Sequence, residues 1–161
     1  MTRTALLALL LVLTFLGLAD VWYLADAALT GTALSCSFTG SLAALSGCNQ
    51  VAQSAYSHFL GLPLALYGFG FYAILFVIAA VLLTTPLRSL YRAAIILSLI
   101  AIVLSLYFVF LQFFVIKALC IYCLASMVIA LLIFLVTWRL WKRFAPVKVA
   151  EPVVPTITQA S

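Results

Sequence analysis

Four long apolar runs dominate this sequence and restrict what it can fold into. They occupy about residues 5–24, 62–83, 90–115 and 119–138. A helix rises about 1.5 Å per residue, so a run of roughly 20 residues is long enough to cross the hydrocarbon core of a bilayer. The 161-residue chain is 68% hydrophobic and only 7% charged, which is too little polar surface for a soluble domain of this size. The sequence therefore predicts an all-α integral membrane protein, a four-transmembrane-helix bundle in one domain.

The positions of the basic residues predict the orientation of this bundle. The net charge is +5, but the basic residues stand at the ends of the apolar runs, which is typical of membrane topology and not of nucleic-acid binding. Seven of the eight fall on one side of the predicted bundle, namely Arg3, Arg88, Arg92, Arg139, Lys142, Arg143 and Lys148. Lys117 alone falls on the other side. Because basic residues favour the cytoplasmic side, we expect a multi-pass protein of a bacterial inner (cytoplasmic) membrane, with both termini cytoplasmic and residues 25–61 and 116–118 outside.

Both ends of the chain call for separate interpretations. Residues 1–27 also resemble a cleavable signal peptide, with Arg3, an apolar run and small residues at Ala25–Asp26–Ala27. The length of the run and the interfacial pair Trp22–Tyr23 favour a retained first span. Residues 144–161 contain three prolines and no periodicity, so we expect a membrane domain at 1–143 followed by a disordered cytoplasmic tail.

The outer segment 25–61 divides into two parts. Residues 26–47 are rich in Ser, Thr, Gly and Ala and read as flexible chain. In the stretch SGCNQVAQSAYSHFLGLP that follows, Val51, Ala55 and Phe59 recur at helical spacing. We expect an amphipathic interfacial helix of about ten residues, ended by Gly61, across the outer end of the bundle.

The four cysteines carry the candidate chemistry, and all lie in or beside the outward elements, where disulfides are permitted. Cys120 and Cys123 form a CxxC at the start of the fourth run, where helix N–H groups favour the thiolate. Cys36 and Cys48 form a second pair in the outer loop. The two pairs together favour a two-stage thiol relay, and thiols at the edge of the hydrocarbon point to a lipid-soluble acceptor, a quinone. No nucleotide, flavin or haem motif is present.

Other interpretations of these cysteines remain open. The CxxC thiols could simply pack as small apolar side chains, and the loop pair could be a structural disulfide of an inert assembly subunit. The four cysteines could also bind zinc, or a soft ion such as Cu(I) or Hg(II) in a membrane metal carrier or sensor.

Three motifs resemble the vitamin K epoxide reductase family in its bacterial form, over about residues 16–138. They are CNQVAQSAYS at 48–57, GLPLALYG at 61–68 and CIYC at 120–123. This resemblance implies that Cys36 exchanges with a thioredoxin-like partner, that Cys48 attacks Cys120, and that Cys123 is oxidised by the quinone, either ubiquinone or menaquinone. The implied product is a disulfide for exported proteins. No fused thioredoxin-like domain follows the fourth run, so we expect a thioredoxin-like or DsbA-like exported partner that acts in trans.

Several further residues are candidates for the quinone site. Our choices for contacts are Ser54, Tyr56, Gln112 and Met127. Family members that reduce epoxide carry Asn and Tyr at positions that align with Leu64 and Met127 here, which favours quinone reduction over epoxide reduction.

Two polar stripes and two titratable residues complete the list. We expect two small or polar stripes to face the bundle interior, either for close helix packing or beside the quinone. They are Ser98, Ala101, Ser105 and Gln112 on the third run, and Cys123, Ser126, Met127 and Ala130 on the fourth. His58 and Asp20 are candidate proton carriers. A surface position for the histidine and an interfacial one for the aspartate are the simpler interpretations.

Overall fold

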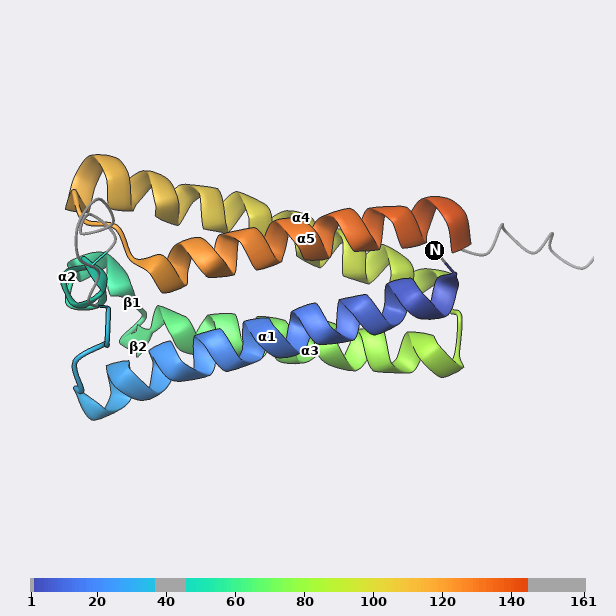
Figure 1. Ribbon diagram of the computed structural model, residues 1–161, viewed down its shortest axis with the longest axis horizontal. Helices are drawn as coiled ribbons and strands as arrows, with labels where there is room; N and C mark the ends of the chain where they lie inside the picture. The colour runs from blue at the N-terminus through green and yellow to red at the C-terminus, as the bar shows by residue number, and fades with distance from the viewer. Residues whose placement is uncertain (1, 37–45, 145–161) are drawn as a thin grey trace, which may run out of the picture.

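The computed structural model of the chain describes residues 2–36 and 46–144, and within them four helices are long and apolar enough to cross a membrane (Figure 1). They are α1 (Arg3–Thr30), α3 (Leu64–Thr84), α4 (Arg88–Phe110) and α5 (Ile121–Phe144). The predicted all-α four-helix membrane bundle is confirmed. Of the segment 26–47 that was predicted to be flexible, residues 26–30 instead continue α1, and residues 37–45 lie outside the described residues, as does the predicted tail from 145.

The helices pack as an elongated bundle in which α1 contacts both α3 and α5, and α4 lies along α5 (Figure 1). Close packing depends on small residues, as is usual in membranes. At Gly17 of α1, a Cβ atom would lie 2.3 Å from the ring of Tyr72 in α3. The glycine therefore lets the Tyr72 ring reach across α1 toward α5, where its hydroxyl lies 3.1 Å from Ser126 Oγ.

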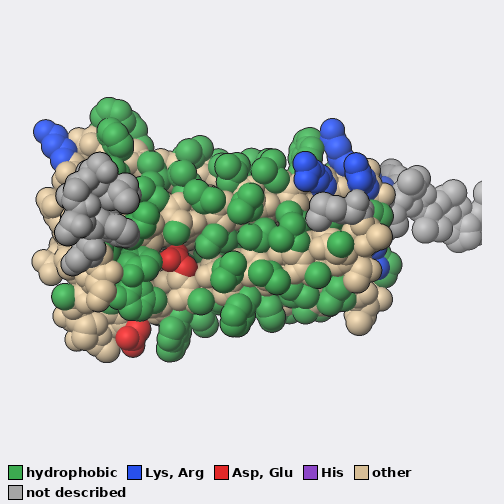
Figure 2. All heavy atoms as spheres, viewed as in Figure 1, with side chains coloured by type: hydrophobic (Ala, Val, Ile, Leu, Met, Phe, Trp, Pro, Cys, Tyr) green, Lys and Arg blue, Asp and Glu red, His purple; other side chains and the backbone are tan. Residues whose placement is uncertain are grey.

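The two ends of the bundle differ in charge, as Figure 2 shows. Most described basic residues gather at the end where α1 begins and α5 ends, whereas Lys117 stands alone at the opposite end. Arg3 donates from Nε to the Tyr91 hydroxyl at 3.0 Å and from its guanidinium to the carbonyl of Leu82, which ties the first helix to its neighbours at the basic end. The predicted orientation depends on this unequal distribution of basic residues between the two ends.

The opposite end carries the short elements α2 (Cys48–Ala52), the 3₁₀ turn η2 (Ala55–Ser57), β1 (His58–Phe59) and β2 (Leu62–Pro63). The prediction of one interfacial helix of about ten residues is wrong, because α2 has five residues. Serine side chains compete with the helical pattern there: Ser54 Oγ donates to the Val51 carbonyl at 2.7 Å, and Ser57 Oγ donates to the Ser54 carbonyl at 2.8 Å.

A tight hairpin then leads into α3. His58 pairs with Pro63 and Phe59 pairs with Leu62. The two residues between the strands, Leu60 and Gly61, both have positive φ, of 51° and 79°. Positive φ at both central positions is the geometry that two-residue hairpins prefer, and glycine adopts it without strain.

The end of α4 changes character before the CxxC. The helix widens into the π-helix η3 (Leu111–Ile116), and Lys117 then adopts a left-handed conformation with φ of 56°. The Ala118 N–H donates to the Gln112 carbonyl at 3.1 Å and closes the turn. Single π turns often mark functional sites, and this one lies immediately before the CxxC.

Candidate active site

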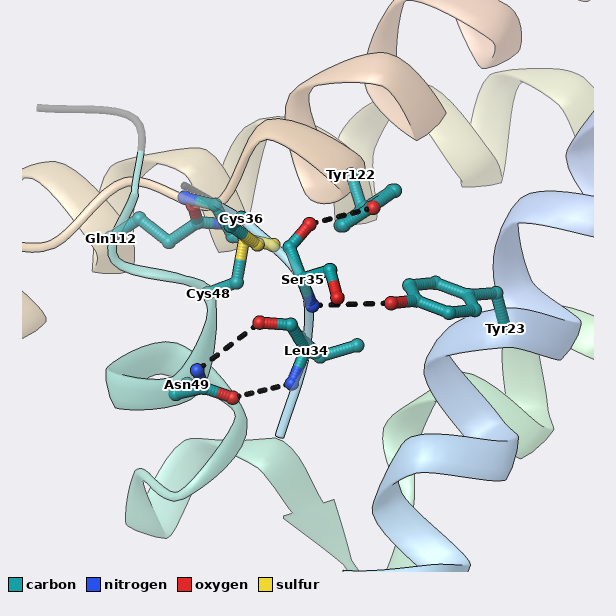
Figure 3. The surroundings of a disulfide bond; sticks show 9 residues. Tyr23, Leu34, Ser35, Cys36, Cys48, Asn49, Gln112 and Tyr122 are labelled. Atoms are coloured by element: carbon teal, nitrogen blue, oxygen red, sulfur yellow. Dashed lines mark hydrogen bonds between the residues drawn. A yellow bond between two sulfur atoms is a disulfide. The ribbon is translucent and has the colours of Figure 1, made fainter. Parts of the chain in front are cut away.

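The structure brings the four cysteines together at the end of the bundle opposite the basic cluster, although they come from three separate segments. Cys36, Cys48 and Cys120 belong to one buried cluster, and Cys123 packs against it. Cys36 and Cys48 form a disulfide with a Cα–Cα distance of 6.2 Å, whereas Cys120 and Cys123 are free thiols (Figure 3). An oxidised pair and a reduced pair therefore lie side by side, which is the arrangement that thiol–disulfide exchange requires.

Backbone pairing fixes the loop pair against the CxxC. Ser46 forms an antiparallel bridge with Cys120, and the Gly47 N–H donates to the Leu119 carbonyl at 3.0 Å. The approach is very close: a Cβ atom on Gly47 would lie 2.8 Å from the Ala118 Cβ and 3.0 Å from the Leu119 nitrogen. Gly47 precedes Cys48 directly, so this contact sets the position of Cys48 relative to Cys120.

A second set of hydrogen bonds holds the segment that carries Cys36 (Figure 3). The Asn49 side chain accepts from the Leu34 N–H at 2.7 Å and donates back to the Leu34 carbonyl at 3.3 Å. The Ser35 N–H donates to the Tyr23 hydroxyl at 3.2 Å, and the Tyr122 hydroxyl donates to the Ser35 carbonyl at 3.1 Å. The chain just before Cys36 is thus tied to α1, α2 and α5 at once.

Sequence reasoning missed this set of residues. Asn49 was interpreted only as part of the predicted interfacial helix, and Tyr23 only as an interfacial anchor. Their position next to a cysteine and at the outer end of a span was the available signal. It did not indicate their partner, because residues 34 and 35 are distant from them in sequence.

Gln112 supports the CxxC directly. It is 2% exposed, and its Oε1 accepts a hydrogen bond from the Cys120 N–H at 2.9 Å. A buried N–H without a partner costs free energy, so the amide of Gln112 stabilises the start of the CxxC turn. The interpretation of Gln112 as a quinone contact stays a prediction, whereas its support of the CxxC is a feature of the structure.

The electrostatics of the pair favour Cys120 as the thiolate. A hydrogen bond from the Cys123 thiol is the largest influence and lowers the pKa of Cys120 from 9.0 to about 7. Burial raises the pKa, the backbone N–H groups of Cys123 and Tyr122 lower it, and the charge of Asp20 raises it. A thiol with a pKa near neutral is both a competent nucleophile and a good leaving group.

A cavity of about 360 Å³ lies beneath the cysteines, and its lining is mostly apolar. This volume and character are typical of sites for small organic molecules. Three of the four thiol or disulfide cysteines line it, namely Cys48, Cys120 and Cys123, whereas Cys36 is not among the lining residues. The reactive pair therefore faces the cavity, and Cys36 does not.

The structure places three of the four candidate contacts in this cavity. Ser54, Tyr56 and Gln112 contribute to the lining, but Met127 does not. Met127 follows Ser126 on α5, and only Ser126 reaches the cavity. Residues three and four positions apart share a face of a helix, so both Ser126 and Met127 could have lain on the face of Cys123. In the structure, Ser126 lines the cavity together with Cys123, and Met127 does not.

The polar stripe of α4 divides between two environments. Ser98 is buried and lies 3.0 Å from Thr137 of α5, so it serves helix packing. Ala101 and Ser105 line the cavity, as does the exposed His58, whose Nδ1 lies 2.8 Å from Ser57 Oγ. Both alternatives that the sequence left open for the stripe therefore apply, at different positions.

The geometry also bears on the metal-ion interpretation. Disulfide-bonded sulfur atoms are not thiolate ligands, so with Cys36 bonded to Cys48 the four cysteines do not form the four-thiolate set that structural zinc takes. In the described part of the chain, no group of three or more His, Cys, Asp and Glu side chains is arranged to hold a metal ion.

Comparison with known proteins agrees with the motifs. The model of the vitamin K epoxide reductase family matches residues 8–138, which is most of the chain and includes every cysteine. A search of curated proteins gives no match.

Proposed function

Because the chain belongs to the vitamin K epoxide reductase family, whose members are membrane oxidoreductases, we propose that it reoxidises a thioredoxin-like partner and reduces a membrane quinone. Electrons pass through Cys36, Cys48, Cys120 and Cys123. The observation that carries the proposal is the juxtaposition of the Cys36–Cys48 disulfide with the free thiols of Cys120 and Cys123 above an apolar cavity.

The outer step is disulfide exchange with the partner. A partner thiolate attacks Cys36, the Cys36–Cys48 bond breaks, and Cys48 leaves as a thiolate. The second partner thiol then displaces Cys36 and completes the partner disulfide. Cys36 suits this role because it is the cysteine that does not line the cavity, and the partner acts in trans on the outer side of the membrane.

The inner step transfers the electrons to the CxxC. When Cys120 and Cys123 are disulfide-bonded, the Cys48 thiolate attacks Cys120 and Cys123 leaves. Cys36 then displaces Cys120 from Cys48, which regenerates the Cys36–Cys48 disulfide and two thiols in the CxxC. The structure has this last distribution of bonds.

The final step oxidises the two thiols at the cavity. One S–S bond forms between Cys120 and Cys123, and two electrons and two protons pass to the quinone, which leaves as quinol. The cavity is large enough and apolar enough for a quinone ring, and Ser54, Tyr56 and Gln112 are the polar side chains that we propose orient it. Through these steps the protein, located in the bacterial inner membrane, would drive disulfide formation in exported proteins.

A trapping experiment tests the order of transfer. In Cys123→Ala, attack by Cys120 on the loop disulfide should give a Cys48–Cys120 bridge and a free Cys36 thiol, and alkylation of that thiol blocks the return reaction and traps the bridge. Non-reducing digestion and mass spectrometry should then find the two peptides joined. The matched control is Cys120→Ala, which should keep the Cys36–Cys48 bridge alone. Recovery of only the Cys36–Cys48 bridge in both variants would overturn the proposed exchange between Cys48 and Cys120.

A further inference from the structure

Asp20 occupies a position in the bundle that the thiol relay does not explain. Its Oδ2 is buried and is the one buried side-chain polar atom without a hydrogen-bond partner in the described part of the chain. α1 continues for ten residues beyond it, to Thr30, so Asp20 lies about 15 Å below the outer end of the helix at 1.5 Å per residue. Asp20 therefore stands well within α1 and not near its end, and the interpretation that it reaches interfacial water stays a prediction.

A carboxyl group at this depth is costly unless it has a function. Burial of a carboxylate with an oxygen that lacks a partner carries a desolvation penalty, and acidic residues inside membrane helices commonly serve proton or ion movement. The ordinary structural explanation, a carboxylate that reaches out to interfacial water, does not suit an oxygen that is enclosed.

The neighbours of Asp20 connect it to the cavity. The Ser126 side chain of α5 interacts with the Asp20 carboxyl. Ser126 Oγ lies 3.1 Å from the Tyr72 hydroxyl, which also donates to the Ser126 carbonyl at 3.2 Å. Both Ser126 and Tyr72 line the cavity, together with Cys123. A short series of exchangeable protons thus runs from the carboxyl to the space beneath the thiols.

The titratable groups around Asp20 come from every helix packed against it. They are Tyr72 of α3, and Tyr122 and Cys123 of α5 with Cys120 just before that helix. The charge of Asp20 acts on all four of them. These include both thiols that must lose their protons in the final step, which couples the protonation of Asp20 to the redox state of the CxxC.

We propose that Asp20, acting through the Ser126 hydroxyl, exchanges protons between the Cys120–Cys123 thiols and the molecule reduced in the cavity. The inference rests on the proposed function and concerns only its final step. As the S–S bond forms, two S–H bonds break and two electrons leave with two protons. Asp20 accepts the two protons from the thiols one after the other and passes each to a quinone oxygen, so the carboxyl is unchanged over one cycle and the atoms balance.

The test compares three substitutions in the full-length protein. Asp20→Asn removes the titratable group with little change in shape, Asp20→Glu restores it, and Asp26→Asn is the matched control, because Asp26 is exposed on the same helix. The protein is reduced, mixed with a soluble ubiquinone analogue, and quinone absorbance is followed in a single turnover across a range of pH. Protein-mediated proton transfer commonly contributes about 10²-fold or more, so Asp20→Asn should slow this step by about that factor and flatten its pH dependence.

The other outcomes separate this inference from its premise. Asp20→Glu and Asp26→Asn should reduce quinone within a few-fold of the unsubstituted protein, and Ser126→Ala should resemble Asp20→Asn. Formation of the Cys48–Cys120 bridge in the Cys123→Ala background should proceed normally with Asp20→Asn, which also shows that the variant is folded. An Asp20→Asn protein with unchanged rate and pH profile would overturn the inference and leave the relay intact. Failure of the unsubstituted protein to reduce quinone would overturn the proposed function itself.

Discussion

Gly47 offers the sharpest structural test of how the two cysteine pairs meet. Its φ of −78° lies outside the left-handed region that favours glycine, so alanine can adopt the backbone conformation of Gly47. The added Cβ, however, would lie 2.8 Å from the Ala118 Cβ, 3.0 Å from the Leu119 nitrogen and 3.1 Å from its oxygen. Two carbon atoms prefer about 3.5–4.0 Å, so the loop must move away from the CxxC by roughly 1 Å.

This displacement should affect rate more than stability. Overpacking of this kind costs about 1–3 kcal/mol, which a membrane bundle tolerates. Moving a reacting group by about 1 Å can slow a reaction by about 10²-fold. We therefore expect Gly47→Ala to slow attack between Cys48 and Cys120 by about 10- to 100-fold, because Cys48 is the next residue and moves with it.

The assay measures how fast the Cys48–Cys120 bridge accumulates in the Cys123→Ala background after the loop disulfide is reformed. Gly70→Ala is the matched control, because no atom lies within 4 Å of a Cβ built there. The control should keep the original rate. A Gly47→Ala protein that forms the bridge as fast as the Gly70→Ala protein would show that the backbone contact does not position Cys48.

Three further predictions concern the same site. Alkylation of Cys120 should increase with pH around a midpoint near 7, because the lowered pKa makes the reactive thiolate available two units below the usual 9.0; a midpoint near 9 in mass-spectrometric labelling would contradict the lowered value. Gln112→Leu should lower the free energy of unfolding by about 1–3 kcal/mol, because it leaves the Cys120 N–H without a partner. Chemical denaturation in detergent measures this change, and an unchanged unfolding midpoint would contradict it. Asn49→Ala should make the Cys36–Cys48 disulfide easier to reduce, because the segment before Cys36 loses two hydrogen bonds. Titration with dithiothreitol tests this, and an unaltered reduction midpoint would mean that these two hydrogen bonds do not stabilise the disulfide.

The sequence predicted the architecture well because hydropathy and helix rise act locally. The four apolar runs became α1, α3, α4 and α5, and only their ends moved, most of all at the C-terminal ends of α1 and α5, which extend to Thr30 and Phe144. The convergence of the cysteines was expected from motifs, but hydrophobic periodicity alone would not bring residues 36 and 120 together.

What the sequence could not predict depends on contacts between distant segments. The length of α2 was overestimated because Ser54 and Ser57 bond to nearby carbonyls in place of a continued helix. The role of Gln112 depends on the π turn that aims its amide at Cys120, and the depth of Asp20 depends on where α1 ends. None of these features leaves a periodic signal in the chain.

The central claim is that these sulfur atoms carry electrons from partner dithiols to a quinone. Its most direct test is turnover by the purified protein in vesicles, with a reduced thioredoxin-like protein outside and quinone in the lipid, followed by quinone absorbance. The account predicts steady loss of quinone absorbance with equal formation of partner disulfide, and neither in Cys123→Ala. Bleaching by Cys123→Ala at the original rate, or a native protein whose four thiols stay reduced around a bound metal ion, would contradict it.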